Sequence, residues 1–319
     1  MIDKYKRNIN YLRISLTDRC NLRCRYCMPE EGVVPKLNHE DILRFEQILK
    51  IIKASSLIGI NKIRYTGGEP LIMNGIDNLI YETSSIEGIE DISITTNGIL
   101  LCDAAGDLKK AGLNRVNISL DTLNEKKFNS ITRGGDLNKV IQAIEKCISL
   151  GYSPVKINVV LLKGINDDEI QDFINLTLDM PIHVRFIELM PMGTAVDLYK
   201  DENIKCDEII KNFTVLEHIT NEKSSTAELY KLPDAKGLVG FIRPISCKFC
   251  SSCNRIRLTS TGTIKPCLHS KQEYDIKPYI ENEENLILLL KKIILSKPVE
   301  HHLEAGISSS EKMMYEIGG

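Results

Sequence analysis

Residues 11–27 read YLRISLTDRCNLRCRYC, in which an apolar, strand-like segment leads into a loop that carries Cys20, Cys24 and Cys27. Polar and charged residues surround the three thiols, so packing in a hydrophobic core does not account for them. Protein-bound iron–sulfur clusters usually take four cysteine ligands, and a tight set of three predicts a cluster with one iron open to a non-protein ligand. An open metal position is where chemistry occurs.

The composition of the whole chain limits its partners. Its 319 residues include 41 basic and 43 acidic side chains, so it has no overall field that would attract nucleic acid or an anionic membrane. Any anionic ligand must therefore be held by local arginines and lysines. The chain lacks the roughly 20 uninterrupted apolar residues of a membrane span, and its polar start lacks a secretion signal. We predict a cytoplasmic protein with no membrane or nucleic-acid partner.

Cysteine usage agrees with this location. Of the ten cysteines, six fall into two clusters. Because cytoplasmic thiols stay reduced, clustered cysteines indicate metal or redox work rather than disulfides. Cys102, Cys147 and Cys206 stand alone and are interpreted as small apolar residues.

Hydrophobic periodicity predicts strands that alternate with helices over the first ~200 residues. The expected strands are 11–16, 62–65, 91–95, 115–120, 155–162 and 183–189, and the expected helices are 39–57, 75–86, 101–111, 136–150 and 167–179. Such alternation implies parallel pairing and right-handed crossovers, which gives an α/β fold. Six strand–helix units suit a partial (β/α)6 TIM-like barrel, although an open doubly wound sheet would show the same pattern.

The alternation stops near residue 196, so we predict one domain over residues 1–200 and a C-terminal domain over 201–319. The last segment, 300–319, is polar and is expected to be partly mobile. The unusual residues of the first domain cluster at the carboxyl ends of its strands, where parallel α/β folds build active sites. They include Gly67-Gly68-Glu69-Pro70, whose glycines allow a ligand to approach the backbone closely.

A second cysteine group lies in the C-terminal domain and comprises Cys250, Cys253 and Cys267, with Cys247 just before it. One interpretation is a structural zinc site with Cys247 or His269 as the fourth ligand, because such spacing suits tetrahedral zinc. The other interpretation is a second cluster with an open iron.

Two arginines follow Cys253 with alternating spacing. In an extended segment Arg255 and Arg257 face the same side, so both could reach one anion. Charge-assisted Arg–phosphate bonds contribute roughly 1.5–3 kcal/mol each.

The first cysteine loop resembles the signature of the radical S-adenosylmethionine superfamily, which is Cys-x3-Cys-x2-Cys with an aromatic residue, here Tyr26, before the third cysteine. The resemblance implies a [4Fe–4S] cluster on Cys20, Cys24 and Cys27, with S-adenosylmethionine on the open iron. It also implies S-adenosylmethionine contacts at four positions, which are Tyr26, Gly68, Ser119 and Met190. A turn glycine, a capping serine and a core methionine are the plainer interpretations of the last three.

Nearly the whole chain resembles the GTP 3′,8-cyclase family of molybdenum cofactor biosynthesis. The likeness runs from residues 12–15 through Thr66-Gly67-Gly68-Glu69-Pro70 and the second cysteine group to the closing Gly318-Gly319. It implies a second [4Fe–4S] cluster on Cys250, Cys253 and Cys267 that meets guanine, with Cys247 and His269 as bystanders. The implied GTP-binding residues are Arg13, Arg64, Thr95, Lys156, Arg255 and Arg257, and the implied catalytic residues are Arg13, Arg255, Arg257, Gly318 and Gly319.

The family resemblance also implies the reaction and the partners. A 5′-deoxyadenosyl radical takes the 3′ hydrogen of GTP, and the ribose radical attacks C8 of guanine to give (8S)-3′,8-cyclo-7,8-dihydroguanosine 5′-triphosphate. The implied partners are GTP, an electron donor and the downstream cyclic pyranopterin monophosphate synthase, and a homodimer is compatible with the sequence.

Two rival interpretations remain at the level of sequence. One is a radical enzyme with an auxiliary cluster that acts on a peptide, which a longer cysteine-rich tail would favour. The other is an electron carrier or zinc-binding module without catalytic activity. Both predict no GTP-dependent cleavage of S-adenosylmethionine.

Overall fold

A computed structural model of the chain describes residues 1–33, 38–220, 225–303, 308–310 and 312–318. Its strands are β1 (Tyr11–Ser15), β2 (Lys62–Thr66), β3 (Asp91–Thr96), β4 (Arg115–Ser119), β5 (Val155–Val160), β6 (Ile182–Ile187), β7 (Glu217–Ile219), β8 (Glu228–Lys231), β9 (Leu238–Ile242), β10 (Arg255–Leu258), β11 (Thr263–Lys265) and β12 (Tyr274–Asp275). Its helices are α1 (Phe45–Ser56), α2 (Ile76–Ser84), α3 (Leu101–Lys110), α4 (Glu125–Thr132), α5 (Leu137–Ser149), α6 (Ile170–Asp179), α7 (Ala195–Glu202), α8 (Cys206–Asn212), α9 (Glu283–Leu295) and α10 (Met314–Ile317). Short 3-10 turns occupy His39–Asp41, Pro70–Ile72, Asp167–Glu169, Cys250–Ser252 and Lys277–Tyr279.

All these strands belong to one curved sheet in the order β12-β11-β10-β1-β2-β3-β4-β5-β6-β9-β8-β7. Strands β10, β1 to β6 and β9 run parallel to one another, whereas β11 and β12 on one side and β7 and β8 on the other are antiparallel additions. Among the described residues the sheet has two free ends, β12 and β7, so it does not close. The predicted partial barrel is confirmed.

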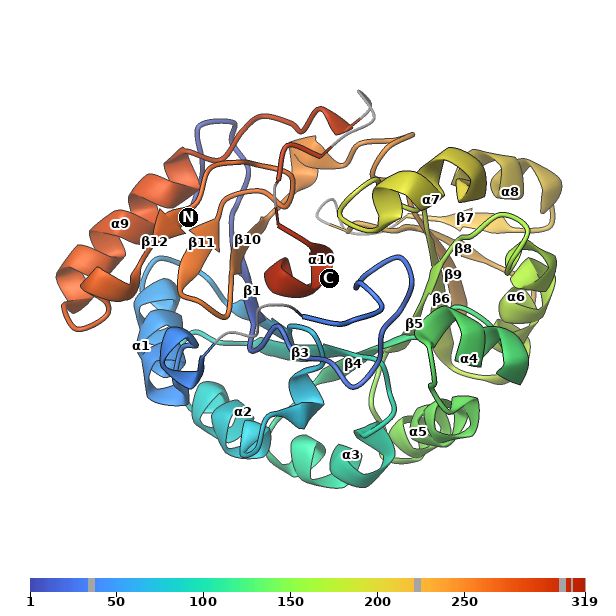
Figure 1. The fold of residues 1–319 in the computed structure, drawn as a ribbon, viewed down its shortest axis with the longest axis horizontal. Helices are drawn as coiled ribbons and strands as arrows, with labels where there is room; N and C mark the ends of the chain where they lie inside the picture. The colour runs from blue at the N-terminus through green and yellow to red at the C-terminus, as the bar shows by residue number, and fades with distance from the viewer. Residues whose placement is uncertain (34–37, 221–224, 304–307, 311, 319) are drawn as a thin grey trace.

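Helices cover the convex side of the sheet, and the concave side faces the centre of the molecule (Figure 1). Each helix buries an apolar stripe against the strands. In α5, for example, Val140, Ala143, Ile144 and Cys147 are buried at helical spacing, and the Asp136 side chain caps the helix by accepting a hydrogen bond from the Asn138 amide.

The predicted elements differ from the structure in several places. The helix expected over 167–179 begins as a 3-10 turn at Asp167–Glu169, and the irregular segment expected after residue 196 contains α7 and α8. The helix expected over 39–57 is interrupted, because His39–Asp41 forms a separate 3-10 turn and α1 begins only at Phe45. Helix α4, between β4 and α5, was not predicted, because its sequence EKKFNSIT is short and polar. Asn124 caps it by accepting hydrogen bonds from two backbone amides.

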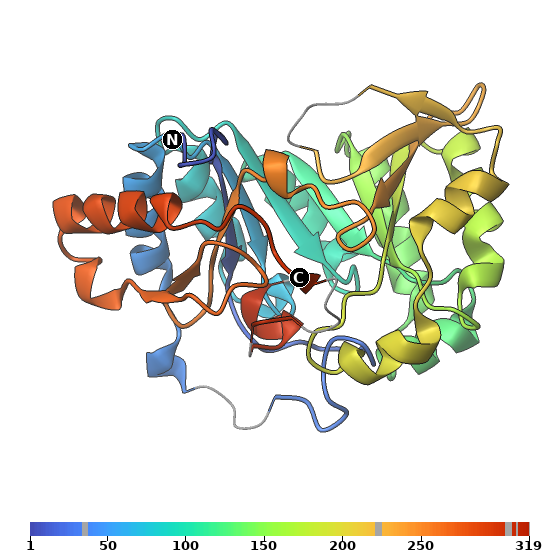
Figure 2. The same cartoon turned by 90° about the horizontal axis from the view of Figure 1, so that it is seen from above.

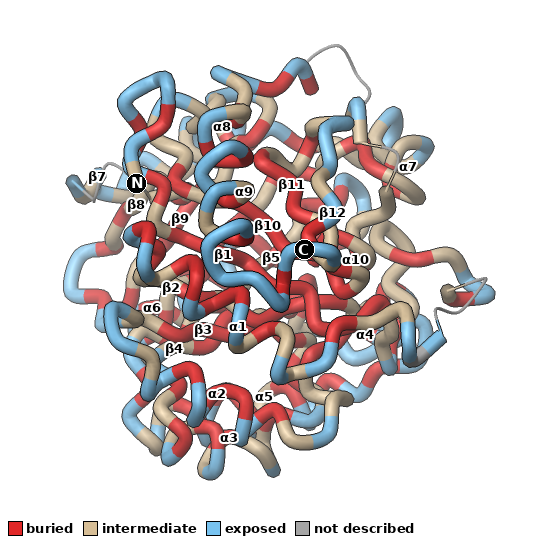
Figure 3. The backbone as a smooth tube through the Cα atoms, turned by 90° about the vertical axis from the view of Figure 1, so that its left-hand side faces the viewer, coloured by how far each residue is buried: buried red, intermediate tan, exposed pale blue. Residues whose placement is uncertain are grey.

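The C-terminal part of the chain extends the same sheet at both ends. Strand β9 pairs in parallel with β6, and β10 pairs in parallel with β1. Helix α9 packs beside α1 on the outside, where Lys50 and Glu281 form an exposed ion pair. The outward face of α9 is exposed in Figure 3, while the strands behind it are buried. The division at residue 200 stays a prediction.

The chain ends inside the curve of the sheet. Helix α10 lies within the arc formed by the strands in Figure 1, and Figure 2 shows the same arrangement from above. Tyr315 and Ile317 of α10 are buried. In the described part of the chain, every helix is too short or too polar to span a bilayer.

Candidate functional site

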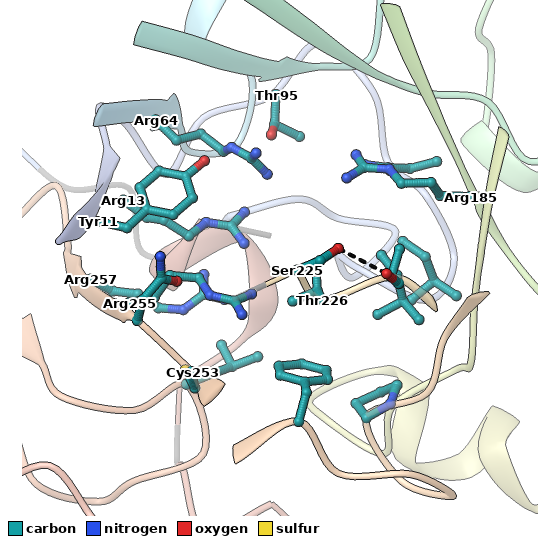
Figure 4. Close-up of a pocket in the computed structure, with 18 of the residues that line it drawn as sticks. Tyr11, Arg13, Arg64, Thr95, Arg185, Ser225, Thr226, Cys253, Arg255 and Arg257 are labelled. Carbon is teal, nitrogen blue, oxygen red and sulfur yellow. Dashed lines mark hydrogen bonds between the residues drawn. The ribbon is translucent and has the colours of Figure 1, made fainter. Parts of the chain in front are cut away.

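A cavity of about 480 Å³ lies on the concave side of the sheet. We call it the cation-lined cavity, because basic side chains from five strands enter it. These side chains are Arg13, Arg64, Lys156, Arg185, Arg255 and Arg257. In Figure 4, Arg13, Arg64 and Arg255 extend into the space that Arg185 enters from the opposite side. The predicted GTP-binding residues Arg13, Arg64, Thr95, Lys156, Arg255 and Arg257 therefore line one cavity.

Strand alternation explains why buried strands carry these charges. In β1, Leu12 and Ile14 are fully buried in the hydrophobic core, while Arg13 between them lines the cavity. Lys156 occupies the same kind of position in β5 between Val155 and Ile157. Because successive side chains point to opposite faces, one face of the sheet forms the core and the other forms a polar site.

Burial and mutual repulsion lower the pKa of several of these basic groups. The pKa of Lys156 is lowered to about 6 by burial and by the neighbouring Arg185, Arg115 and Arg64. Burial, with other arginines, likewise lowers the pKa of Arg185 to about 9 and that of Arg257 to about 10. Crowding of like charges in a buried space favours the binding of an anion, which would relieve both effects.

Several buried polar atoms in the cavity have no hydrogen-bond partner among the described residues. They include Thr95 Oγ1, Asn158 Oδ1, Arg185 Nε, Asn254 Oδ1, and Arg255 Nε and Nη2. Buried polar groups are normally paired, because an unmet donor or acceptor costs free energy. The cavity thus offers both donors and acceptors to a polar, anionic ligand.

The second cysteine group lines the same cavity. Cys250, Cys253 and Cys267 are free, half-buried thiols, whereas Cys247 is exposed and outside the lining. His269 also lines the cavity, and its Nδ1 lies 3.3 Å from Ser308 Oγ. Among the described residues no set of three His, Cys, Asp or Glu side chains converges on a single metal ion. Three free thiols that line one cavity fit an iron–sulfur cluster, whose usual protein ligands are cysteines.

The first cysteine group occupies the loop after β1. Cys20, Cys24 and Cys27 are free and half-buried, and burial raises the pKa of all three thiols. The Cys20 sulfur accepts a hydrogen bond from the Leu22 amide at 3.4 Å. Three thiolate donors in one exposed-to-half-buried loop fit a cluster with one open iron.

Tyr26 anchors this loop to the sheet. Its hydroxyl donates a 2.7 Å hydrogen bond to Asp121 Oδ2, just beyond β4, and Asp121 Oδ1 accepts one from the Val160 amide at the end of β5. Burial raises the pKa of Asp121 to about 6. The role of Asp121 was not predicted, although its position at a strand end was.

Gly68 lies against the same loop. A Cβ atom on Gly68 would lie 2.1 Å from the backbone oxygen of Arg19, so only glycine fits there. The Gly68 amide donates to Thr17 O at 2.7 Å, which fixes this glycine against the segment that leads into the cysteine loop. The neighbouring Glu69 is buried and accepts hydrogen bonds from Thr96 Oγ1 and the Asn97 amide, which ties β2 to β3.

The C-terminal tail adjoins both cysteine sites. Arg257 Nη1 donates a 2.5 Å hydrogen bond to the carbonyl oxygen of Gly318, and Met314 lines the cation-lined cavity. Tyr315 lies close enough to Cys27 to feel its charge. The first cysteine group is outside the cavity lining, and α10 contributes Met314 to the cavity and Tyr315 to the surroundings of Cys27. Gly319 is outside the described residues.

Of the two remaining predicted S-adenosylmethionine contacts, only one lines the cavity. Met190, which follows β6, lines the cavity, whereas Ser119 is half-buried at the end of β4 and outside the lining. Arg185 lines the cavity but was missed by sequence reasoning, because the family resemblance that implied Lys156 did not supply it. Tyr11, whose ring the Arg64 guanidinium approaches at 5.3 Å, was also missed.

Comparison with known proteins places this geometry in a family. Residues 14–177 match the model of the Radical SAM superfamily, and residues 182–303 match that of Molybdenum Cofactor Synthesis C. A GTP 3′,8-cyclase of Clostridium botulinum is 59% identical over 320 residues, covering 100% of both chains. One of Clostridium acetobutylicum is 54% identical over 321 residues, again covering 100% of both. The crystal structure of Streptococcus suis SuiB bound to S-adenosylmethionine has a TM-score of 0.65 at 16% identity over 95% of this chain and 68% of that one, which indicates a shared fold.

Proposed function

Since this chain belongs to the GTP 3′,8-cyclase family of radical S-adenosylmethionine enzymes, we propose that its cation-lined cavity binds GTP beside a second iron–sulfur cluster. The enzyme converts GTP to (8S)-3′,8-cyclo-7,8-dihydroguanosine 5′-triphosphate in the first step of molybdenum cofactor biosynthesis. Members of the family use two [4Fe–4S] clusters and S-adenosylmethionine. When bound, the first cluster and S-adenosylmethionine supply the 5′-deoxyadenosyl radical that removes the 3′ hydrogen of GTP.

The loops after the strands are proposed to hold the first cluster and S-adenosylmethionine. Cys20, Cys24 and Cys27 would hold the first cluster, and Tyr26 keeps their loop on the sheet through Asp121. The Gly68 carbonyl, Ser119 and Met190 are proposed to contact S-adenosylmethionine. Each of these groups lies at or just beyond the carboxyl end of a strand, where the loops of a barrel form its active site.

Three arginines are proposed to hold the triphosphate. Arg13, Arg255 and Arg257 come from the paired strands β1 and β10, with Arg13 opposite Arg257 in the register. Guanidinium groups can bind phosphate oxygens in a bidentate manner, which fixes orientation as well as charge. Arg64 brings further positive charge to the cavity, Lys156 does so once it is protonated, and Thr95 and Asn158 bring polar oxygen atoms.

The second cysteine group is proposed to hold a cluster that positions guanine. Cys250, Cys253 and Cys267 line the same cavity as the arginines, so one nucleotide can touch both. Holding the ribose near the radical source lowers the activation barrier, since a bound near-attack geometry removes several kcal/mol of entropic cost. The Gly318 carbonyl beside Arg257 helps to close this space against water.

A single observation carries the proposal: the basic side chains and the second set of three thiols share one cavity, with the C-terminal tail between it and the first set. The test is anaerobic incubation of the iron- and sulfide-reconstituted protein with GTP, S-adenosylmethionine and a reductant. We expect 5′-deoxyadenosine to form only when GTP is present. Formation of 5′-deoxyadenosine that ignores GTP, or a colourless protein loaded with zinc, would contradict the proposal.

The partners beyond GTP are proposed from family membership alone. They are an electron donor for the first cluster and the cyclic pyranopterin monophosphate synthase that takes the product, and a homodimer is compatible with the fold. We also propose a cytoplasmic location, which the ten free thiols support, because a reducing compartment keeps such thiols available to iron.

A further inference from the structure

Lys297, which follows α9, ties together the two segments that carry the second cysteine group. Its side chain is buried, with 3% of the residue exposed. The ammonium donates hydrogen bonds to the backbone oxygens of Arg255, at 2.8 Å, and Pro266, at 2.7 Å. Arg255 lies two residues after Cys253, and Pro266 immediately precedes Cys267. One buried ammonium therefore links the two segments that carry these cysteines.

Lys297 lies beside the second cysteine group. It lines the cation-lined cavity together with Cys250, Cys253 and Cys267, and it is close enough to Cys250 and Cys253 for its charge to act on their sulfurs. An ammonium has three donors, and Lys297 directs two of them to the carbonyls of Arg255 and Pro266.

Lys297 differs from another buried lysine nearby. Lys265, with 0% of its side chain exposed, pairs with Glu273 at 2.8 Å. None of the ion pairs formed by the described residues includes Lys297. A buried charge is costly unless an opposite charge accompanies it. The groups that can supply this charge are the thiolates beside it.

We propose that Lys297 is the positioning residue and the fixed counter-charge of the second iron–sulfur cluster, and that its positive charge raises the reduction potential of that cluster. The inference rests on the proposed function, because it presumes a cluster on Cys250, Cys253 and Cys267. Cluster potentials depend on net charge and on hydrogen bonds to the ligand sulfurs, so a nearby cation stabilises the reduced, more negative state.

Arg7 provides a matched structural control. Its Nη1 donates to the backbone oxygens of Cys250 and Val299, both at 3.0 Å, and its Nη2 donates to Pro298 O at 2.8 Å. It therefore clamps the segment that carries Lys297 to the same cysteine loop, but through backbone carbonyls. Loss of Arg7 should loosen the site without removing the positive charge that Lys297 places near the cysteine sulfurs.

The experiment uses the full chain with Cys20→Ala, Cys24→Ala and Cys27→Ala, so that only the second cluster is observed. The reconstituted protein should contain about four irons per chain, the content of one [4Fe–4S] cluster. Anaerobic redox titration followed by electron paramagnetic resonance then compares Lys297→Gln, Lys297→Arg and Arg7→Gln in this background. We expect Lys297→Gln to shift the potential to more negative values and to change the signal of the reduced cluster. Lys297→Arg should restore both, and Arg7→Gln should lower cluster content while leaving the potential of the assembled clusters unchanged.

Two outcomes separate the proposals. A background protein that takes up no iron would refute the second cluster itself. Full iron content with the same potential and signal in Lys297→Gln would overturn the role of Lys297 and leave the second cluster intact. If Lys297→Gln assembles no cluster, rescue by Lys297→Arg supports the positioning role, whereas equal loss in all three variants overturns it.

Discussion

The guanidinium of Arg257 donates a hydrogen bond to the carbonyl oxygen of Gly318, so a strand that lines the cavity and the end of the chain are directly connected. Arg257 is also a proposed triphosphate ligand. A nucleotide in the cavity must therefore share this arginine with the tail or displace the tail from it. The tail and the substrate are coupled through one side chain.

Gly318→Ala tests this coupling. A Cβ atom at Gly318 would lie 2.4 Å from Thr66 Cγ2, and the residue has a φ of +81°, which disfavours a side chain. We expect kcat to fall by up to about 100-fold, because a 1 Å misplacement can cost that much, while GTP binding is retained. Gly106→Ala is the control, since a Cβ atom there meets nothing within 4 Å in α3. Steady-state kinetics measures both, and an unchanged kcat for Gly318→Ala would contradict the role of the tail.

Arg255→Met tests the anion site. Arg255 Nε and Nη2 are buried and have no hydrogen-bond partner among the described residues, so we expect their main role to be binding a ligand. We expect the GTP dissociation constant to rise by about 10- to 100-fold, since a charge-assisted hydrogen bond contributes roughly 1.5–3 kcal/mol. Isothermal titration calorimetry measures it, with the exposed Lys110→Met as the control. Equal GTP affinity in Arg255→Met and the parent protein would show that the triphosphate lies elsewhere.

GTP binding should depend on pH through Lys156. The pKa of Lys156 is lowered to about 6, so this amine is mostly neutral at pH 7 in the free protein. A bound triphosphate favours the charged form and raises the pKa, so binding takes up a proton and affinity falls as pH rises above 6. Calorimetry at pH 7 in buffers of different ionisation enthalpy measures the uptake. Lys156→Met should remove the proton uptake that Lys156 contributes to GTP binding. Proton uptake that persists in full in this variant would show that another group takes up the proton.

Tyr26→Phe should loosen the first cysteine loop. The change removes the hydroxyl that donates to Asp121 at 2.7 Å and leaves a buried carboxylate oxygen without that donor. An unpaired buried group costs about 1–3 kcal/mol. We expect faster loss of iron from the first site during chelator challenge, with the second site unaffected. Tyr81→Phe, with an exposed side chain in α2, should match the parent protein; equal iron loss from both variants would deny Tyr26 this role.

Cys267→Ala and Cys247→Ala should behave differently. Cys267 lines the cavity, whereas Cys247 is exposed and outside the lining. We expect Cys267→Ala to bind S-adenosylmethionine but to lose GTP-dependent formation of 5′-deoxyadenosine, while Cys247→Ala keeps both. Product analysis by chromatography separates the two results. Normal turnover by Cys267→Ala would show that the second cysteine site is misassigned.

Local patterns predicted the first six strands closely. Each observed strand from β1 to β6 lies within one or two residues of its expected bounds, because apolar side chains recur on buried strands. Helix α4 escaped prediction because EKKFNSIT lacks a strong apolar stripe. Arg185 escaped because a single charged residue in a strand does not reveal which face it occupies.

By itself, the sequence determined the two cysteine groups, the α/β alternation and the family resemblance, because ligand spacing and hydrophobic periodicity are properties of short segments. Only the tertiary structure decided that β9 and β10 join opposite ends of the parallel sheet, that Lys297 bridges the segments of Cys253 and Cys267, and that Gly318 meets Arg257. These relationships join residues far apart in the chain. They arise when strand pairing and burial bring those residues together, and no local pattern records that event.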